Sequence, residues 1–121
     1  MPSLKILWLA RPKDHNYPAA QSFLTLIYPA AKASALVARL KRAPISKFLS
    51  RDIVRASGVS PRNASKTHLN KDRKKIRSKT PLSPILLVRD PRGRVLIADG
   101  YHRLCAAYLS DENAFVPCKI V

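Results

Sequence analysis

The sequence predicts a small α+β domain that carries an N-terminal helical extension. Apolar residues recur at helical spacing through residues 18–43, which indicates the helical part. Two apolar runs, 84–89 and 94–98, flank Asp90-Pro91-Arg92-Gly93, whose Asp, Pro and Gly occupy the positions that a type I turn prefers. A chain of 121 residues with 46% apolar composition fits one modest core.

Residues 1–43 are expected to form an N-terminal segment and a helical extension packed on the core. Residues 4–9 are apolar enough for a strand or an edge segment, and a loop follows. Pro18 suits the first turn of a helix. Pro29 then ends or kinks that helix. Residues 18–43 therefore form either a helical pair or one kinked helix, which packs against the sheet or, alternatively, serves as an interaction arm.

Residues 44–121 are expected to form the α+β domain itself. A strand at 45–49 precedes a short helix at 51–57. Ser50 is a suitable N-cap for this helix, and Gly58 is a typical C-cap signal. A loop then leads to the second half of the domain.

Two helices and three strands are expected in that second half. A basic helix is expected at 69–78, with its apolar residues on one side. The two apolar runs at 84–89 and 94–98 form a β-hairpin. A helix at 102–110 and a terminal strand at 115–120 complete the domain.

The net charge is the second strong feature of the chain. There are 23 Lys and Arg against 7 Asp and Glu, which gives +16. Such an excess predicts an anionic ligand or a polyanionic partner such as DNA or RNA. An acidic protein is an alternative partner. A further alternative is that the basic residues form a solvated helix face that contacts no partner. No apolar run reaches the roughly 20 residues of a membrane-spanning helix, so no membrane partner is expected. The candidate nucleic-acid contacts are Lys71, Arg73, Lys74, Lys75, Arg77 and Lys79.

The strand at 94–98 leads directly into Asp-Gly-Tyr-His-Arg at 99–103 and then into a helix. Free N–H groups at a helix start attract anions, and basic side chains add to that attraction. Gly100 lets the backbone approach a ligand or take a positive φ. The pattern therefore predicts a phosphate site at Gly100, His102 and Arg103. The alternative is an ordinary strand-to-helix turn with surface His and Arg.

Asp-Gly-Tyr-His-Arg-Leu-Cys-Ala-Ala-Tyr at 99–108 resembles the signature of the ParB/sulfiredoxin superfamily. The apolar stretches 82–88 and 116–121 resemble the flanking strands. The resemblance extends over 44–121 and is best at 81–121. It implies a ParB/sulfiredoxin-like fold and contact between the signature and nucleotide phosphates. It also implies ATP or CTP with Mg²⁺ as candidate ligands, and it leaves open a phosphoryl-transfer or hydrolase activity.

One departure from the superfamily pattern concerns cysteine. Sulfiredoxins place their reactive cysteine directly before His-Arg, where this chain has Tyr101, so sulfinic-acid reduction is not expected. Cys105 falls on the expected apolar face of the following helix. We expect Cys105 and Cys118 to be reduced, structural thiols of a cytoplasmic protein. The spacing of cysteines and histidines fits no zinc motif, so no metal site is expected.

Further candidate residues lie outside the phosphate motif. Thr67 and His68 lie at the start of the basic helix, where N–H groups are free. The resemblance implies a phosphate-binding basic or hydroxyl residue there. In kinase members of the superfamily an acidic residue at the position of Asp99 assists catalysis. A turn aspartate that hydrogen-bonds local backbone is the favoured alternative. His15 is expected to be exposed and inert, and Asp72 to lie on the surface.

Overall fold

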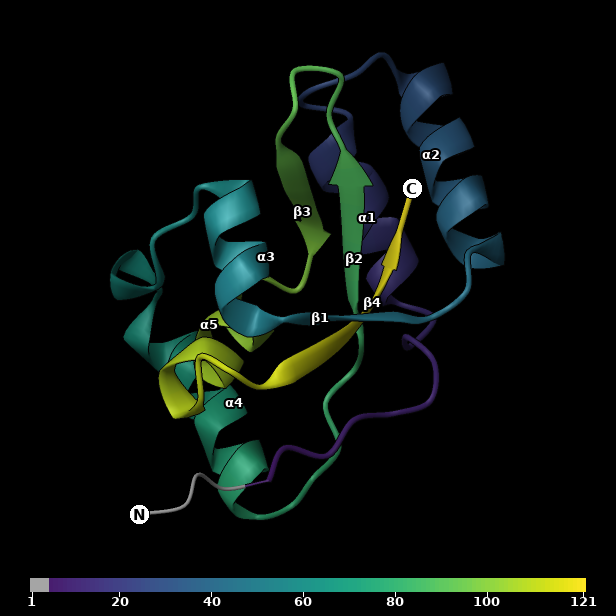
Figure 1. The fold of residues 1–121 in the computed structure, drawn as a ribbon. Coiled ribbons are helices and arrows are strands. Elements are labelled where there is room, and N and C mark those ends of the chain that lie inside the picture. The colour runs from purple at the N-terminus through teal and green to yellow at the C-terminus, as the bar shows by residue number, and fades with distance from the viewer. Residues whose placement is uncertain (1–4) are drawn as a thin grey trace.

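The structure is a computed structural model that describes residues 5–121, and it confirms the predicted α+β class (Figure 1). Within these residues five α-helices surround one four-stranded sheet. In chain order the elements are α1 (Asn16–Leu24), α2 (Ala30–Arg42), β1 (Ser46–Leu49), α3 (Ser50–Ser57), the 3₁₀ turn η1 (Pro61–Asn63), α4 (Lys66–Arg77), β2 (Ile85–Arg89), β3 (Val95–Asp99), α5 (Tyr101–Ser110) and β4 (Phe115–Ile120). None of the described helices is both long enough and apolar enough to cross a membrane.

The sheet is mixed and has the strand order β1-β4-β2-β3. The predicted hairpin is present, because β2 pairs antiparallel with β3. The last strand, β4, lies beside β2 in parallel and beside β1 in antiparallel orientation. This topology places β2 in the interior of the sheet, where four of its five residues are buried.

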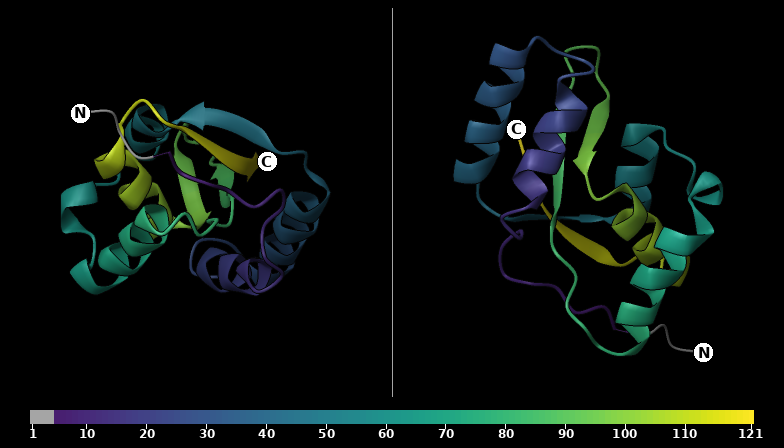
Figure 2. Two further views of the ribbon diagram at one scale, coloured as in Figure 1. Left: turned by 90° about the horizontal axis from the view of Figure 1, so that it is seen from below. Right: turned by 180° about the vertical axis from the view of Figure 1, so that it is seen from behind.

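Helices cover both faces of the sheet (Figure 2). The alternating side chains of β2 explain why both faces need a cover. Leu86 and Val88 pack with apolar residues of α1 and α2 on one face. Ile85 and Leu87 pack with residues of α3 and α5 on the other. α4 in turn packs against α5 through a third cluster that contains Leu69, Ile76 and Cys105.

The N-terminal region forms two helices rather than one kinked helix. Pro29 stands at the N-cap of α2 and separates it from α1, and both helices bury apolar residues against the sheet. α1 begins at Asn16, before Pro18. Of the expected strand at 4–9, Leu4 lies outside the described residues. The part that is described makes a single parallel bridge, Trp8 to Leu82.

Two local expectations need correction. Ser50 does not cap α3, because Leu49 takes the N-cap position and Ser50 is the first helical residue. The Ser50 hydroxyl is buried and is directed at the carbonyl oxygens of Asp111 and Glu112, at 3.0 and 2.8 Å. The basic helix begins three residues earlier than expected, at Lys66. The Gly58 C-cap is confirmed by its left-handed φ of +72°.

Candidate functional site

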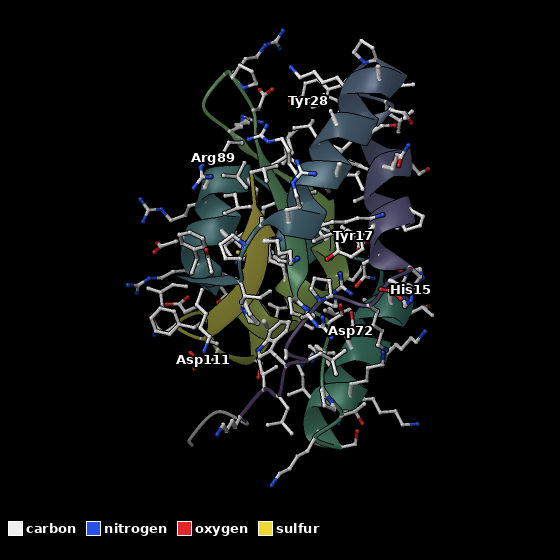
Figure 3. All side chains as sticks on the ribbon, turned by 90° about the vertical axis from the view of Figure 1, so that its right-hand side faces the viewer. His15, Tyr17, Tyr28, Asp72, Arg89 and Asp111 are labelled. Carbon is white, nitrogen blue, oxygen red and sulfur yellow. The ribbon has the colours of Figure 1, made fainter. Side chains whose placement is uncertain are left out.

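A hollow of about 240 Å³ lies where β3 runs into α5, and we call it the α5 pocket. Its wall combines the start of α5, one side of α4, the loop before α1 and the segment before β2. Figure 3 labels two of its residues, His15 and Asp72, on the side of the molecule where α1 and α4 lie. The lining residues are Lys13, His15, His68, Lys71, Asp72, Lys75, Pro81, Leu82, Ser83, Asp99, Gly100, Tyr101, His102 and Arg103.

Gly100 makes the sharp transition from β3 to α5. Its φ is +109°, a conformation that side chains other than hydrogen rarely adopt. A Cβ atom there would also collide with the Ile85 side chain and lie 2.8 Å from Nη2 of Arg103. The first helical bond of α5 runs from the Leu104 N–H to the Gly100 carbonyl, at 2.9 Å. The N–H groups of residues 101–103 therefore have no acceptor within the helix and are available at its N-terminus.

Arg103 and Asp99 form an ion pair in the wall of the pocket. Arg103 Nη2 donates to Asp99 Oδ2 at 2.7 Å, and the two side chains are 14% and 19% exposed. Arg103 Nη1 makes a longer contact of 3.5 Å to Oδ1 of Asn16. Arg103 Nε is buried and has no hydrogen-bond partner in the described part of the chain. Asp99 thus positions Arg103, whereas the favoured interpretation from the sequence assigned this carboxylate to local backbone.

All three histidines of the chain line the α5 pocket, although they come from three different regions. The rings of His68 and His102 lie 4.8 Å apart between centroids, at an angle of 41°. Burial lowers the pKa of His102, and the neighbouring His68 lowers it further, while Asp72 acts in the opposite direction. His102 is therefore mainly neutral at pH 7. His15 is exposed as expected, and it lines the α5 pocket, while its expected inertness stays a prediction.

Asp72 is a second correction. The sequence interpretation placed it on the surface, yet it is only 9% exposed and lies on the inward side of α4. Burial raises the pKa of its carboxyl, and Lys75 is the largest of several cations that oppose this rise. Leu69, Asp72 and Ile76 follow helical spacing, so the same periodicity that located the apolar side of the helix could have identified Asp72.

The predicted nucleic-acid contacts on α4 and in the loop after it lie in different surroundings. Lys71 and Lys75 line the α5 pocket, as does His68. Arg73 and Arg77 instead line a small separate hollow beside Ser110. The remaining predicted contacts, Lys74 and Lys79, are exposed, and so is Thr67, which lines neither hollow.

Lys13 is a site residue that the sequence analysis missed. Its backbone N–H donates to Oγ of Ser83 at 3.0 Å, and the Ser83 hydroxyl donates to Oδ1 of the buried Asn16. These bonds hold the loop before α1 against the segment before β2. The contact joins residues 70 positions apart, so no local pattern in the sequence indicates it.

Cys105 and Cys118 are both free and fully buried. Burial raises the pKa of each thiol, to about 11 for Cys118. Neither cysteine lines the α5 pocket. At neutral pH both groups are therefore thiols, which are poor nucleophiles compared with thiolates.

Within residues 5–121 no three His, Cys, Asp or Glu side chains come together in an arrangement that could hold a metal ion. Asp99, the carboxylate of the signature, is engaged by Arg103.

Comparisons with known proteins found no matching family model, no matching curated protein and no matching solved structure.

Proposed function

We propose that the α5 pocket binds the phosphate groups of a nucleotide or another phosphorylated molecule. The observation that carries this proposal is the convergence of cations from distant parts of the chain. Lys13, Lys71, Lys75 and Arg103 all line one hollow, together with the three histidines and only two carboxylates. The Lys, Arg and Asp side chains of the pocket therefore carry four positive and two negative charges. The free N–H groups at the start of α5 add to the attraction for an anion.

The size of the pocket favours phosphate over a whole nucleotide. Pockets that enclose drug-sized ligands measure roughly 300–1,000 Å³, and this one holds about 240 Å³. One or two phosphate groups would occupy it, and the nucleoside would extend outside. The ParB/sulfiredoxin resemblance of residues 99–108 supports the same assignment, with Gly100, His102 and Arg103 as contacts. ATP and CTP are the candidate nucleotides.

Phosphoryl transfer or hydrolysis is a second candidate function, favoured by the state of His102. A general base must be unprotonated and able to reach its proton. His102 is mainly neutral at pH 7, since its pKa is lowered. Asp99 is the weaker candidate for this role, because Arg103 already engages its carboxylate. Mg²⁺ prefers carboxylate oxygens, and the pocket has no pair of free carboxylates, so we assign no step to a metal ion.

Nucleic-acid binding by the outer side of α4 is a third candidate. In the described part of the chain only two ion pairs form, Arg55–Asp52 and Arg103–Asp99. Neither of these ion pairs involves a cation of α4. If about five of the cations of α4 neutralised phosphates of a duplex, log K would fall with log salt with a slope of about −4 to −5. Anisotropy of labelled duplex across a salt series measures this slope, and no binding at low salt would exclude the function.

Isothermal titration calorimetry tests the main proposal. Pyrophosphate, ATP and CTP are titrated into the protein, each with and without Mg²⁺. The proposal expects saturable binding of pyrophosphate and of at least one nucleotide, whereas the matching nucleoside without phosphate fails to bind. Absence of saturable binding of every phosphate compound would contradict it, as would equal affinity for nucleoside and nucleotide.

A further inference from the structure

A second basic hollow adjoins the α5 pocket, and we call it the Lys119 pocket. It measures about 780 Å³ and is bordered by Arg11, Lys13, Lys41 and Lys119, with Asp14 as its one carboxylate. Lys13 lines both hollows, which makes them neighbours. Four cations thus stand against one carboxylate here, so the charge balance favours an anion.

Lys119 is the residue that distinguishes this hollow from an ordinary basic surface. It lies on β4, and only 7% of the residue is exposed. Its Nζ donates to the carbonyl oxygen of Lys41 at 2.7 Å and lies 5.8 Å from the centre of the Tyr17 ring. Neither ion pair found within residues 5–121 involves Lys119. An ammonium group has three N–H donors, and a carbonyl and a ring compensate a buried charge only in part.

Lys41 adds a second cation at the same place. Its Nζ lies 5.7 Å from the centre of the Tyr17 ring, so two ammonium groups share one aromatic side chain. Both ammonium groups also border the same hollow, so its electrostatic potential favours an anionic ligand. Figure 3 labels Tyr17, a residue of α1, on the side where His15 and Asp72 of the α5 pocket are labelled.

We propose that the Lys119 pocket is a second anion subsite, and that the two pockets together hold successive phosphates of a single-stranded nucleic acid. The proposal rests on the proposed function of the α5 pocket and names the class of its ligand. Lys13 stands between the two subsites and would contact the linking part of the backbone. A mononucleotide with its phosphates in the α5 pocket would leave Lys119 without an anion, whereas a chain of nucleotides fills both.

The charge of the whole chain agrees with this ligand. A net charge of +16 exceeds what a single nucleotide needs. Four of the nine residues that line the Lys119 pocket carry ammonium or guanidinium groups, which contact phosphates without reading base edges. Binding is therefore expected to tolerate changes of sequence and to depend strongly on salt.

The test compares two double variants of the full chain. Arg11→Gln with Lys41→Gln removes two exposed cations of the Lys119 pocket. Arg39→Gln with Arg92→Gln is the matched control, because both residues are exposed and line neither hollow. The probes are a labelled single strand of about ten nucleotides, which is within known site sizes, and pyrophosphate. Lys119→Met serves as an additional variant, and its folding is checked by circular dichroism.

The proposal expects the Arg11/Lys41 variant to lose about tenfold or more in affinity for the strand, with its salt slope reduced by about 1.4 for two lost contacts. Pyrophosphate binding should stay within about twofold of the parent, which corresponds to well under 1 kcal/mol. The control should change little with either probe. Folded Lys119→Met should show the same selective loss as the Arg11/Lys41 variant.

Each of the following results would overturn the proposal. Equal losses in the Arg11/Lys41 variant and the control would show a general charge effect. Unchanged strand affinity in the Arg11/Lys41 variant would remove the second subsite. Linear polyphosphate and unlabelled strand are compared as competitors of the labelled strand. If polyphosphate displaces the labelled strand at a lower total concentration of phosphate groups, the two pockets are assigned to polyphosphate. A parent that binds pyrophosphate but not the strand contradicts this inference alone, whereas a parent that does not bind pyrophosphate contradicts the proposed function.

Discussion

Nη2 of Arg103 lies 2.7 Å from Oδ2 of Asp99, and this ion pair joins the last residue of β3 to the first turn of α5. The pair fixes the guanidinium in the wall of the α5 pocket, where it can still meet an anion because 14% of the side chain remains exposed. Arg103→Ala should therefore weaken pyrophosphate binding by roughly 1.5–3 kcal/mol, the value of a hydrogen bond to a charged group. Calorimetry measures the loss.

The control for Arg103→Ala is Arg39→Ala, which removes the same charge from an exposed position outside both pockets. Asp99→Asn supplies a second comparison. It removes a carboxylate from the pocket and leaves a side chain that can still accept from Arg103, so pyrophosphate should bind at least as tightly as in the parent. Equal affinity in Arg103→Ala and the parent would contradict the assignment of Arg103.

Gly100 is predicted to be required for stability because of two separate constraints. Gly100→Ala must adopt a positive φ and must also displace the Ile85 side chain. Gly93→Ala is the matched control, because its φ of +89° is equally unusual while no atom lies within 4 Å of its Cβ position. We expect about 1–3 kcal/mol of strain for Gly93→Ala and a larger loss for Gly100→Ala. Urea denaturation compares the two, and equal losses would refute the close approach to Ile85.

Stability should fall on acidification because of His102. Burial and His68 lower the pKa of this imidazole in the folded protein, so the unfolded chain binds the proton more readily. Lowering the pH through the unfolded value of about 6.5 therefore decreases the free energy of unfolding. His102→Gln should remove that part of the pH dependence. Urea denaturation between pH 5 and 8 is the measurement, and an identical pH profile in parent and variant would contradict this account.

Anion binding should have the opposite dependence on pH. Burial and the neighbouring His68 disfavour the protonated form of His102, whereas an anion bound in the α5 pocket would favour it. A bound anion thus raises the pKa of His102, and affinity should increase as the pH falls. Sulfate is the suitable probe, because its own charge stays constant over this range. Affinity for sulfate that is unchanged between pH 8 and 5.5 would exclude His102 from the site.

The cysteines are predicted to be unreactive in the folded protein. Both thiols are buried, and the pKa of Cys118 is raised to about 11. Iodoacetamide at pH 8 should alkylate them only after denaturation, as followed by mass spectrometry. Cys105→Ala should retain pyrophosphate binding and lose about 1 kcal/mol of stability, a typical value for a small truncation in a core. A sulfenate trapped on Cys105 under native conditions would contradict this interpretation.

Much of the fold could be predicted because its signals are local. The Asp90-Pro91-Arg92-Gly93 turn and the apolar runs beside it give the hairpin of β2 and β3 directly. Pro29 and Gly58 mark the ends of helices by their own conformational limits. Ser50 was misassigned because its hydroxyl finds acceptors near residue 111, which no local pattern reveals.

The candidate site was predicted only in part, for the same physical reason. Gly100, His102 and Arg103 follow a strand and open a helix, so their place in the pocket follows from local order. Lys13 reaches the pocket through contacts that span most of the chain. Asp72 was misplaced because its charge was given more weight than its helical spacing.

The most direct test of the central claim uses two pairs of residues on one helix. Lys71 and Lys75 line the α5 pocket, whereas Arg73 and Lys74 do not. Changing either pair to glutamine removes the same charge from α4. The account predicts that the Lys71/Lys75 variant loses about tenfold or more in calorimetric affinity for pyrophosphate, about 1.4 kcal/mol, while the Arg73/Lys74 variant stays close to the parent. Equal losses in the two variants, or no loss in either, would contradict a phosphate site in the α5 pocket.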